Sequence, residues 1–270
     1  MTMSLDGLSP AAVVEVIKAN WAEFYTHLGQ APASELSIGP HLSWLLTGVP
    51  DAFLNVVFRT DLPTDHASDT VDEALQHFRS RHIARLSWLV ESNLTEVARL
   101  LESRGLTFAE GGTAMAADLP AVPAEVPTPD GLAIVRVEDQ IALQQWIEVM
   151  RVGFQIPQAA EKPLFELFAA VALDPPMHTY LALHHGRPIA TSQLLVGAGV
   201  AGIYNVTCLP EARGRGIGTV ITHAPLAEAR RQGHQLSILQ ASRLGYPVYR
   251  RLGFQDYGRL NNFVFSADDA

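Results

Sequence analysis

Three glycines alternate with other residues in a stretch whose composition suits the binding of a small anion. The stretch at 206–219 contains Gly214, Gly216 and Gly218. Because glycine has no side chain, a ligand can approach the backbone closely at these positions. An apolar strand is expected at 201–209, and a helix is expected to begin directly after the glycines. The first turn of such a helix offers free N–H groups and the positive end of the helix dipole, which favours a bound phosphate or pyrophosphate.

The spacing of the glycines excludes two common nucleotide-binding loops. It is Gly-x-Gly-x-Gly, whereas dinucleotide-binding folds use Gly-x-Gly-x-x-Gly with an acidic residue about 20 positions later. A Walker loop needs Gly-Lys-Ser/Thr, but the lysines of the chain are Lys18 and Lys162. The pattern that fits is Arg-x-x-Gly-x-Gly, formed by Arg213, Gly216 and Gly218 after a strand and a proline.

This loop resembles the acyl-CoA-binding loop of the GNAT superfamily of N-acetyltransferases. A second segment at 239–254 resembles the family's other signature, a strand followed by a helix that ends in Tyr-x-x-x-Gly-Phe, here Tyr249 to Phe254. The resemblance covers residues 131–266. It implies an α/β GNAT fold, in which helices flank a mixed central sheet. It also implies acetyl-CoA as the co-substrate and no metal.

The resemblance assigns cofactor contacts to the loop and to the strands before it and after it. The assigned residues are Thr207, Cys208, Arg213, Gly214, Arg215, Gly216, Ile217, Gly218, Thr219, Ser242 and Tyr249. Ser242 is a departure, because many family members have asparagine there. A bulge expected near Thr207 and Cys208 would turn backbone groups toward the pantetheine arm and the thioester carbonyl. A lone strand cysteine is usually buried, so no side-chain chemistry is expected of Cys208.

By the same resemblance, Tyr249 is the general acid that protonates the departing thiolate; the other reading is that it only packs beneath the cofactor. A phenol with a pKa of about 10 can protonate a thiolate only through a well-placed hydrogen bond. Tyr246, one helical turn earlier, is the substitute. Where the family often carries a glutamate as base, this chain has Tyr204 and Asn205, so we expect one of them to hold a water that removes the proton. Tyr204 and Phe154 are expected on the acceptor side.

Hydrophobic periodicity predicts the elements that position these residues. A first helix is expected from Ser9-Pro10 to Gly29, with Trp21 and Phe24 in the core. Further helices are expected at 70–81, 93–103, 138–152, 163–173 and 216–232. Strands are expected at 53–58, 85–90, 132–137, 179–184, 188–196 and 201–209, with a strand pair at 108–117 around Gly111-Gly112. Residues 42–46 are too few to classify. Pro225 lies inside the expected helix at 216–232 and predicts a kink or a split there.

The two halves of the chain share a short pattern. Residues 101–106 (Leu-Glu-Ser-Arg-Gly-Leu) align with 249–254 (Tyr-Arg-Arg-Leu-Gly-Phe). The first half therefore reads as a degenerate GNAT-like domain at 1–119, joined by a proline-rich linker at 120–130 to a catalytic domain at 131–270. Coincidence is the alternative, since glycine commonly ends helices. If the pattern is real, the first domain shapes the acceptor pocket or packs as a structural partner.

Composition and charge indicate which classes of binding partner to expect. The net charge of −9 argues against nucleic acid, yet the segment 213–251 carries seven arginines and the single acid Glu228. A cluster of arginines of this kind suits the phosphates of coenzyme A; the alternative for Arg230 and Arg231 is that they are solvated helix residues without a ligand. A single cysteine, no apolar run of membrane-spanning length and no signal-like N-terminus lead us to expect a cytoplasmic protein without a membrane partner, as a monomer or homodimer.

The leading function is transfer of an acetyl group from acetyl-CoA to a primary amine of a small molecule, by direct attack. The alternative is an acyl-CoA-binding sensor or interaction module without significant turnover. The missing carboxylate base and the degenerate first half favour the alternative. The intact loop and Tyr249 favour the enzyme.

Overall fold

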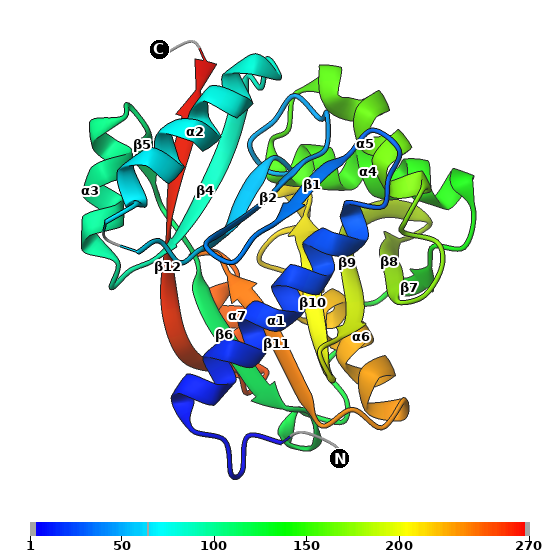
Figure 1. Cartoon of the computed structure of the whole chain (residues 1–270). Coiled ribbons are helices and arrows are strands. Elements are labelled where there is room, and N and C mark those ends of the chain that lie inside the picture. The colour runs from blue at the N-terminus through cyan, green and yellow to red at the C-terminus, as the bar shows by residue number, and fades with distance from the viewer. Residues whose placement is uncertain (1–3, 64, 268–270) are drawn as a thin grey trace.

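The structure is a computed structural model that describes residues 4–63 and 65–267 (Figure 1). The helices are α1 (Pro10–Leu28), α2 (Ala67–Ser80), α3 (Thr95–Ser103), α4 (Gln140–Phe154), α5 (Glu161–Ala169), α6 (Ile217–Arg231) and α7 (Tyr246–Arg251). The strands are β1 (Glu35–Ile38), β2 (Leu42–Leu46), β3 (Val56–Thr60), β4 (Arg85–Glu91), β5 (Thr107–Ala109), β6 (Thr113–Asp118), β7 (Leu132–Arg136), β8 (Met177–His184), β9 (Arg187–Gly197), β10 (Val200–Cys208), β11 (Leu236–Ala241) and β12 (Gln255–Ser266). Among these helices, none combines the length and apolar character that crossing a membrane requires.

The strands form one continuous mixed sheet. Its order is β1-β2-β3-β4-β12-β6-β11-β10-β9-β8-β7, and β5 pairs with β12 beside this path. The pairs β3–β4 and β10–β11 are parallel, and the other described pairs are antiparallel. A helix joins each parallel pair, α2 in the first and α6 in the second. The predicted α/β class, a mixed sheet flanked by helices, is therefore confirmed.

The final strands of the two halves cross into each other's part of the sheet. We call residues 4–119 the N-terminal lobe and residues 131–267 the C-terminal lobe. Strand β6 of the N-terminal lobe pairs along its length with β11. Strand β12 of the C-terminal lobe pairs first with β6 and then with β4 and β5. Each lobe therefore completes its sheet with a strand of the other.

The prediction that the strands on either side of Gly111-Gly112 pair with each other is wrong: both pair with β12. Strands β5 and β6 follow one another along β12 in nearly continuous register, Phe108 opposite Phe263 and Thr113 opposite Arg259. The two glycines break the strand into β5 and β6, and the chain keeps its direction instead of forming a hairpin turn. Gly111 is needed because the chain passes very close to β12 there, and a Cβ would collide with the carbonyl oxygen of Leu260; a Cβ at Gly112 would instead meet the side chain of Gln240 on β11.

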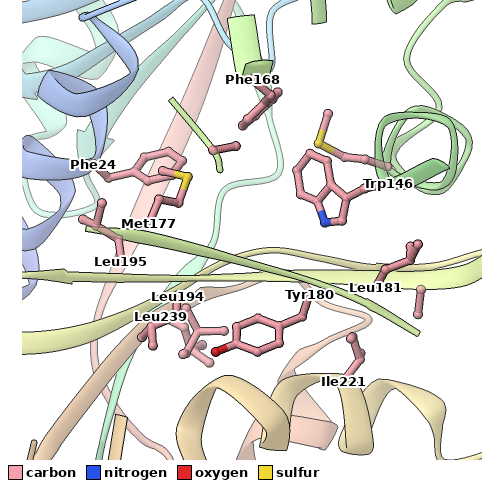
Figure 2. Close-up of a cluster of buried hydrophobic side chains, with 14 of the residues drawn as sticks. Phe24, Trp146, Phe168, Met177, Tyr180, Leu181, Leu194, Leu195, Ile221 and Leu239 are labelled. Carbon is pink, nitrogen blue, oxygen red and sulfur yellow. The ribbon is translucent and has the colours of Figure 1, made fainter. Parts of the chain in front are cut away.

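The helices cover both faces of the sheet in the C-terminal lobe. Figure 2 shows Trp146 of α4 and Phe168 of α5 on one face of the strands, and Tyr180 on the other face toward Ile221 of α6. Trp146 and Phe168 are fully buried and meet edge to face, with ring centroids 5.0 Å apart. Helix α1 of the N-terminal lobe lies on the same face as Trp146 and contributes Phe24 to this core (Figure 2).

Helix α1 confirms the prediction made for it. Ser9 Oγ accepts a hydrogen bond from the Ala12 N–H at 3.2 Å, and Pro10 occupies the first turn. Trp21 and Phe24 are buried at 6% and 4% exposure. The spacing of its apolar residues was sufficient to place this helix and its buried face.

Helix α6 is one continuous helix, so the split considered at Pro225 does not occur. Proline lacks the N–H that would bond the carbonyl of Ile221. In its place the hydroxyl of Ser192, on β9, donates to Ile221 O at 2.8 Å. The sheet thus supplies the hydrogen bond that the proline removes, and both groups are buried.

Other predicted elements are present with shifted ends. The strand expected at 53–58 is β3 at Val56–Thr60. Phe53 lies in the turn before it, where its N–H donates to Asp51 Oδ1 at 2.8 Å. Aspartate bonds of this kind hold turns and delay the start of a strand. Residues 42–46, left unclassified above, form β2.

Candidate active site

The parallel strands β10 and β11 diverge at the centre of the C-terminal lobe. Their pairing runs from Ala201–Ser237 to Ile203–Leu239, and β10 continues for five residues beyond it. At that point β10 breaks register with β9 between Tyr204 and Thr207, where Asn205 has a φ of 50°. Asparagine tolerates this left-handed conformation better than most residues. The bulge predicted near Thr207 and Cys208 is confirmed: it lies between Tyr204 and Thr207, with Asn205 as its left-handed residue.

The glycine loop follows at the open end of the divergence. Gly214 and Gly216 have φ values of 76° and 79°, and Gly216 is the N-cap of α6. No side chain among the described residues caps this helix, so its first-turn N–H groups face outward with the positive end of the dipole. A Cβ added at either glycine would meet no atom within 4 Å. The backbone therefore lies beside open space, as a pyrophosphate site requires.

The other residues predicted in this loop differ in burial and in their hydrogen bonds. Ile217 is buried at 2% exposure, so only its backbone can face a ligand. Arg215 is exposed, and Thr219 is half-buried in the first turn of α6. Arg213 donates from Nε to Cys208 O and from Nη2 to Gly153 O, each at 3.2 Å. Arg213 thus ties the loop to the end of β10 and to α4.

Tyr249 lies next to Cys208 at the divergence. The phenol is 6% exposed, and burial together with the Cys208 thiol raises the pKa of Tyr249 well above its usual value. Burial also raises the pKa of Cys208 to about 11, which the cation of Arg213 only partly opposes. Both groups therefore stay protonated at neutral pH. A protonated phenol is the form that a general acid needs.

The loop before α7 contains Ser242 and Gly245, and Gly245 lies against the ring of Tyr249. Ser242 Oγ accepts a hydrogen bond from the Gly245 N–H at 3.2 Å, so the hydroxyl holds the turn. A Cβ at Gly245 would lie 2.7 Å from Tyr249 Cε2. Gly245 was missed by the sequence reasoning, although a glycine one turn before a catalytic tyrosine is a signal of close approach. Tyr246, the substitute acid, donates from its hydroxyl to Asp256 at 2.8 Å.

Asn205 belongs to a buried chain of hydrogen bonds. Its Nδ2 donates to Gln193 Oε1 at 2.5 Å, and Gln193 Nε2 donates to Thr179 Oγ1 at 3.0 Å. Its carbonyl accepts from Thr191 Oγ1 at 2.8 Å. These bonds fix the Asn205 amide in one orientation. Gln193 is a further residue that the sequence reasoning missed.

The two residues expected on the acceptor side both contact the N-terminal lobe. Tyr204 donates from its hydroxyl to Asn20 Oδ1 at 2.6 Å, and its ring stacks on Phe24 at 3.9 Å between centroids. Phe154 ends α4 rather than lying in a loop, and its ring lies 4.6 Å from that of Phe53. Phe53 is 36% exposed and could not be singled out from the sequence, because it was placed in a strand.

Contacts near the bulge join β10 to α4 and α6. A Cβ at Gly153 would collide with the Thr207 side chain, and one at Gly218 would lie 3.9 Å from Cys208 Sγ. The structure therefore brings together Thr207, Cys208, Arg213, Gly218 and Tyr249.

Some of the arginines in segment 213–251 contact other parts of the chain instead of facing a ligand. Arg230 donates to the carbonyls of Val122 and Ala124 in the proline-rich linker, and His223 bonds Pro123 O at 2.8 Å. Arg231 pairs with Glu228. Arg230 therefore fastens the linker to α6 and is not a plain solvated residue.

Comparison with known proteins gives one family-model match and several structures of the same fold. Residues 197–256 match the model of the acetyltransferase (GNAT) domain. A GCN5-related N-acetyltransferase from Kribbella flavida superposes with a TM-score of 0.66 at 18% identity, over 91% of this chain and 95% of that one. One from Sphaerobacter thermophilus gives 0.65 at 18% identity, over 96% and 94%. A tandem GNAT protein of the clavulanic acid biosynthesis pathway gives 0.60 at 15% identity, over 99% and 98%.

These findings confirm the resemblance drawn from the two sequence signatures. The chain has the GNAT fold, and residues 197–256 match the GNAT acetyltransferase domain model. At such low identities the structural likeness shows the fold alone. A search of curated protein sequences gave no match.

Proposed function

We propose that this protein transfers an acetyl group from acetyl-CoA to a primary amine of a small molecule. The observation that carries the proposal is the divergence of β10 and β11, which opens between the uncapped α6 and the buried phenol of Tyr249. Acetyl-CoA supplies an activated thioester. The amine nitrogen bonds the acyl carbon, the carbon–sulfur bond breaks, and the departing sulfur takes a proton.

The residues of this chain have separable roles in the proposed reaction. The backbone N–H groups from Gly214 to Gly218 hold the pyrophosphate, together with the Thr219 hydroxyl and the positive charge of Arg215. The bulge at Asn205 turns backbone groups of β10 toward the divergence, where they bind the pantetheine arm and the thioester carbonyl. Tyr249 Oη donates the proton that the sulfur takes. Its raised pKa keeps the phenol protonated but makes it a weaker acid, so the donation depends on a direct hydrogen bond to the departing sulfur.

Removal of the amine proton falls to water under this proposal. The Asn205 amide is held by Gln193, which fixes it as a hydrogen-bonding partner for such a water. Replacement of Asn205 by alanine is expected to slow turnover, and unchanged turnover would remove Asn205 from the mechanism.

The second candidate is an acyl-CoA-binding module without significant turnover. It is favoured by one observation: the bulge carries an amide at Asn205, which cannot act as a base, and that amide is already bonded to Gln193. In this reading the chain binds acetyl-CoA through the same loop and reports on its level. The two-lobe division at 119 and 131 is part of both candidates, and it stays our proposal.

The experiment is chromatographic detection of free CoA after incubation with acetyl-CoA and a panel of primary amines. Chromatography detects CoA itself, so the thiol of Cys208 does not enter the readout as it could with a thiol reagent. Acceleration by one amine class supports the enzyme. Stabilisation against heat by acetyl-CoA without turnover supports the binding module. Absence of any such stabilisation contradicts both candidates.

A further inference from the structure

Two aromatic rings meet where the lobes adjoin, and neither is fully covered. Phe53 lies in the turn before β3 of the N-terminal lobe, and Phe154 is the last residue of α4 in the C-terminal lobe. Their ring centroids are 4.6 Å apart, and the ring planes are inclined by 30°. Phe53 is 36% exposed and Phe154 is half-buried. This aromatic pair is therefore a surface to which each lobe contributes one side chain.

The turn that carries Phe53 is held by a buried side chain. Asn55 is 2% exposed, and its amide donates to Val49 O at 2.8 Å and to Asp51 O at 3.1 Å. Asp51 Oδ1 in turn accepts from the Phe53 N–H at 2.8 Å. Because these bonds fix the backbone of the turn, a ligand that contacts Phe53 does not have to order it first.

Phe154 adjoins the part of β10 to which the proposed reaction assigns the thioester. It directly follows Gly153, where an added Cβ would overlap the Thr207 side chain at the bulge. The Gly153 carbonyl also accepts from Arg213 Nη2 at 3.2 Å. Consecutive Cα atoms are about 3.8 Å apart, so the Phe154 backbone lies one residue from this contact with β10. A short substituent on an amine at the bulge covers such a distance.

The aromatic pair and the cofactor loop lie on opposite faces of the sheet. Figure 2 shows α4 and α6 on the two sides of the strands. Successive strand residues point to opposite faces: Thr207 meets Gly153 on the α4 side, whereas Cys208 adjoins Gly218 on the α6 side. An acceptor on the α4 face therefore approaches the divergence from the side opposite to the cofactor loop, and the two ligands do not compete for space.

The chemistry of the aromatic pair favours an apolar ligand. A phenyl ring has no hydrogen-bonding atom, so it binds through apolar contact area and ring stacking. A partly exposed phenyl ring that is held in place gains most when another apolar group removes it from water. An acceptor that is polar throughout would gain nothing from either ring.

We propose that the acceptor is a primary amine with an aromatic or bulky aliphatic group, and that this group packs on Phe53 and Phe154. The inference rests on the proposed function. Phe53 is then a specificity-determining residue that the N-terminal lobe supplies to the site of the C-terminal lobe. Of the two roles left open above for the N-terminal half, this one is the shaping of the acceptor pocket.

The test compares 2-phenylethylamine and isopentylamine with ethanolamine, a primary amine that has a hydroxyl in place of the apolar group. Values of kcat and KM are measured for the full chain and for Phe53→Ala. The wild type should use the two apolar amines at least tenfold more efficiently than ethanolamine. Phe53→Ala should raise KM for the apolar amines about tenfold, because truncation removes apolar contact area. Its kcat and its KM values for ethanolamine and acetyl-CoA should not change.

Two further variants separate specificity from a general effect of losing a phenyl ring. Phe108, on β5 of the N-terminal lobe, is 54% exposed and packs on Phe263 with 5.7 Å between ring centroids. Phe108→Ala therefore removes a similar ring at a distant place, and it should match the wild type. Phe53→Leu keeps an apolar side chain, so it should raise KM for the apolar amines less than Phe53→Ala does.

Two results overturn the proposal: the wild type uses ethanolamine as well as it uses the apolar amines, or Phe53→Ala and Phe108→Ala change KM equally. If no amine releases CoA, the proposed function is at fault, and the aromatic pair is tested by binding in the presence of CoA. Phenylethylamine should then stabilise the wild type against heat more than it stabilises Phe53→Ala. Equal stabilisation, or none, overturns the inference about the aromatic pair.

Discussion

The molecule contains two strand–helix–strand units built on one plan, and only one of them resembles a cofactor site. In the N-terminal lobe, β3 and β4 are parallel and joined by α2. In the C-terminal lobe, β10 and β11 are parallel and joined by α6. The following junctions match as well: Leu106 N–H bonds Leu101 O at 3.1 Å, and Phe254 N–H bonds Tyr249 O at 3.0 Å.

The loops before the two helices differ in charge and in backbone freedom. Residues 61–66, before α2, contain two aspartates and no glycine, and Asp69 lies in the first turn. The loop before α6 has Gly214 and Gly216 at positive φ and two arginines. Carboxylates near a helix N-terminus complement the positive end of the helix dipole and repel a phosphate. The loop of the N-terminal unit therefore lacks the charge and the backbone conformation of an anion-binding site.

The divergence of the strands is bridged in one unit and open in the other. Thr60, at the end of β3, accepts from Trp88 Nε1 at 3.0 Å and donates to Leu89 O at 3.2 Å. Both partners are on β4, so the hydroxyl spans the gap. Cys208, at the end of β10, adjoins Tyr249 instead. The two units therefore share the arrangement of strands and helix, and a few residues in the loop and at the strand ends decide whether a ligand can bind.

The largest expected effect is that of Tyr249→Phe. Loss of the hydroxyl should lower turnover about 100-fold or more, in the range measured for removal of a general acid, while affinity for acetyl-CoA stays the same. Single-turnover assays and heat stabilisation measure the two quantities. Leu101→Met at the matching N-terminal position is the control, and it should leave turnover unchanged. Wild-type turnover by Tyr249→Phe would return Tyr249 to the reading in which it only packs.

Cys208 should react slowly with alkylating agents at pH 8. Its pKa, raised to about 11, lowers the thiolate fraction there by about 100-fold against an ordinary thiol. Because burial disfavours the charged thiolate, the rate should climb with pH until about 11. The chain has one cysteine, so mass spectrometry of alkylated protein measures it directly. The unfolded chain is the control, and equal rates at pH 8 for folded and unfolded protein would contradict the prediction.

A pair of glycine substitutions separates backbone strain from ligand space. Gly216 and Gly105 have φ values of 79° and 85°, so alanine at either should lower the free energy of unfolding by about 1–2 kcal/mol. Only Gly216→Ala should also weaken acetyl-CoA binding, by about tenfold, because its methyl group would enter the loop's open space. Denaturant titration and calorimetric titration give the two values. Equal affinity in both variants would show that the loop does not hold the pyrophosphate.

The sequence predicted the strongly periodic and motif-bearing parts well. Helix α1, the loop before α6 and the hairpin of β8 and β9 follow from residue spacing and turn chemistry, which are local properties. The strand exchange could not be predicted, because Gly111-Gly112 fits a turn and a close approach equally well. Only the position of Leu260, far along the chain, decides between them.

The predictions for the site depended on the same distinction. Arg213 and Tyr249 were assigned through the resemblance to the two GNAT signatures, and both lie at the divergence. Phe53 and Gln193 were not found, since each reaches the site through tertiary packing and has no sequence pattern of its own. The support that Ser192 gives Ile221 beneath Pro225 was likewise beyond sequence reasoning, which saw the missing N–H but not the hydroxyl that replaces it.

The smallest expected effect tests the bridge in the N-terminal unit. Thr60→Val keeps the shape of the side chain but removes the hydroxyl, leaving the buried Trp88 Nε1 without its acceptor. The free energy of unfolding should fall by about 1 kcal/mol, the usual net worth of a hydrogen bond, and turnover should not change. Thr60→Ser is the matched control, since it keeps the hydroxyl and loses only a methyl group. If denaturant titration gives Thr60→Val no lower stability than Thr60→Ser, the hydroxyl does not close the gap, and the difference between the two units lies in their loops alone.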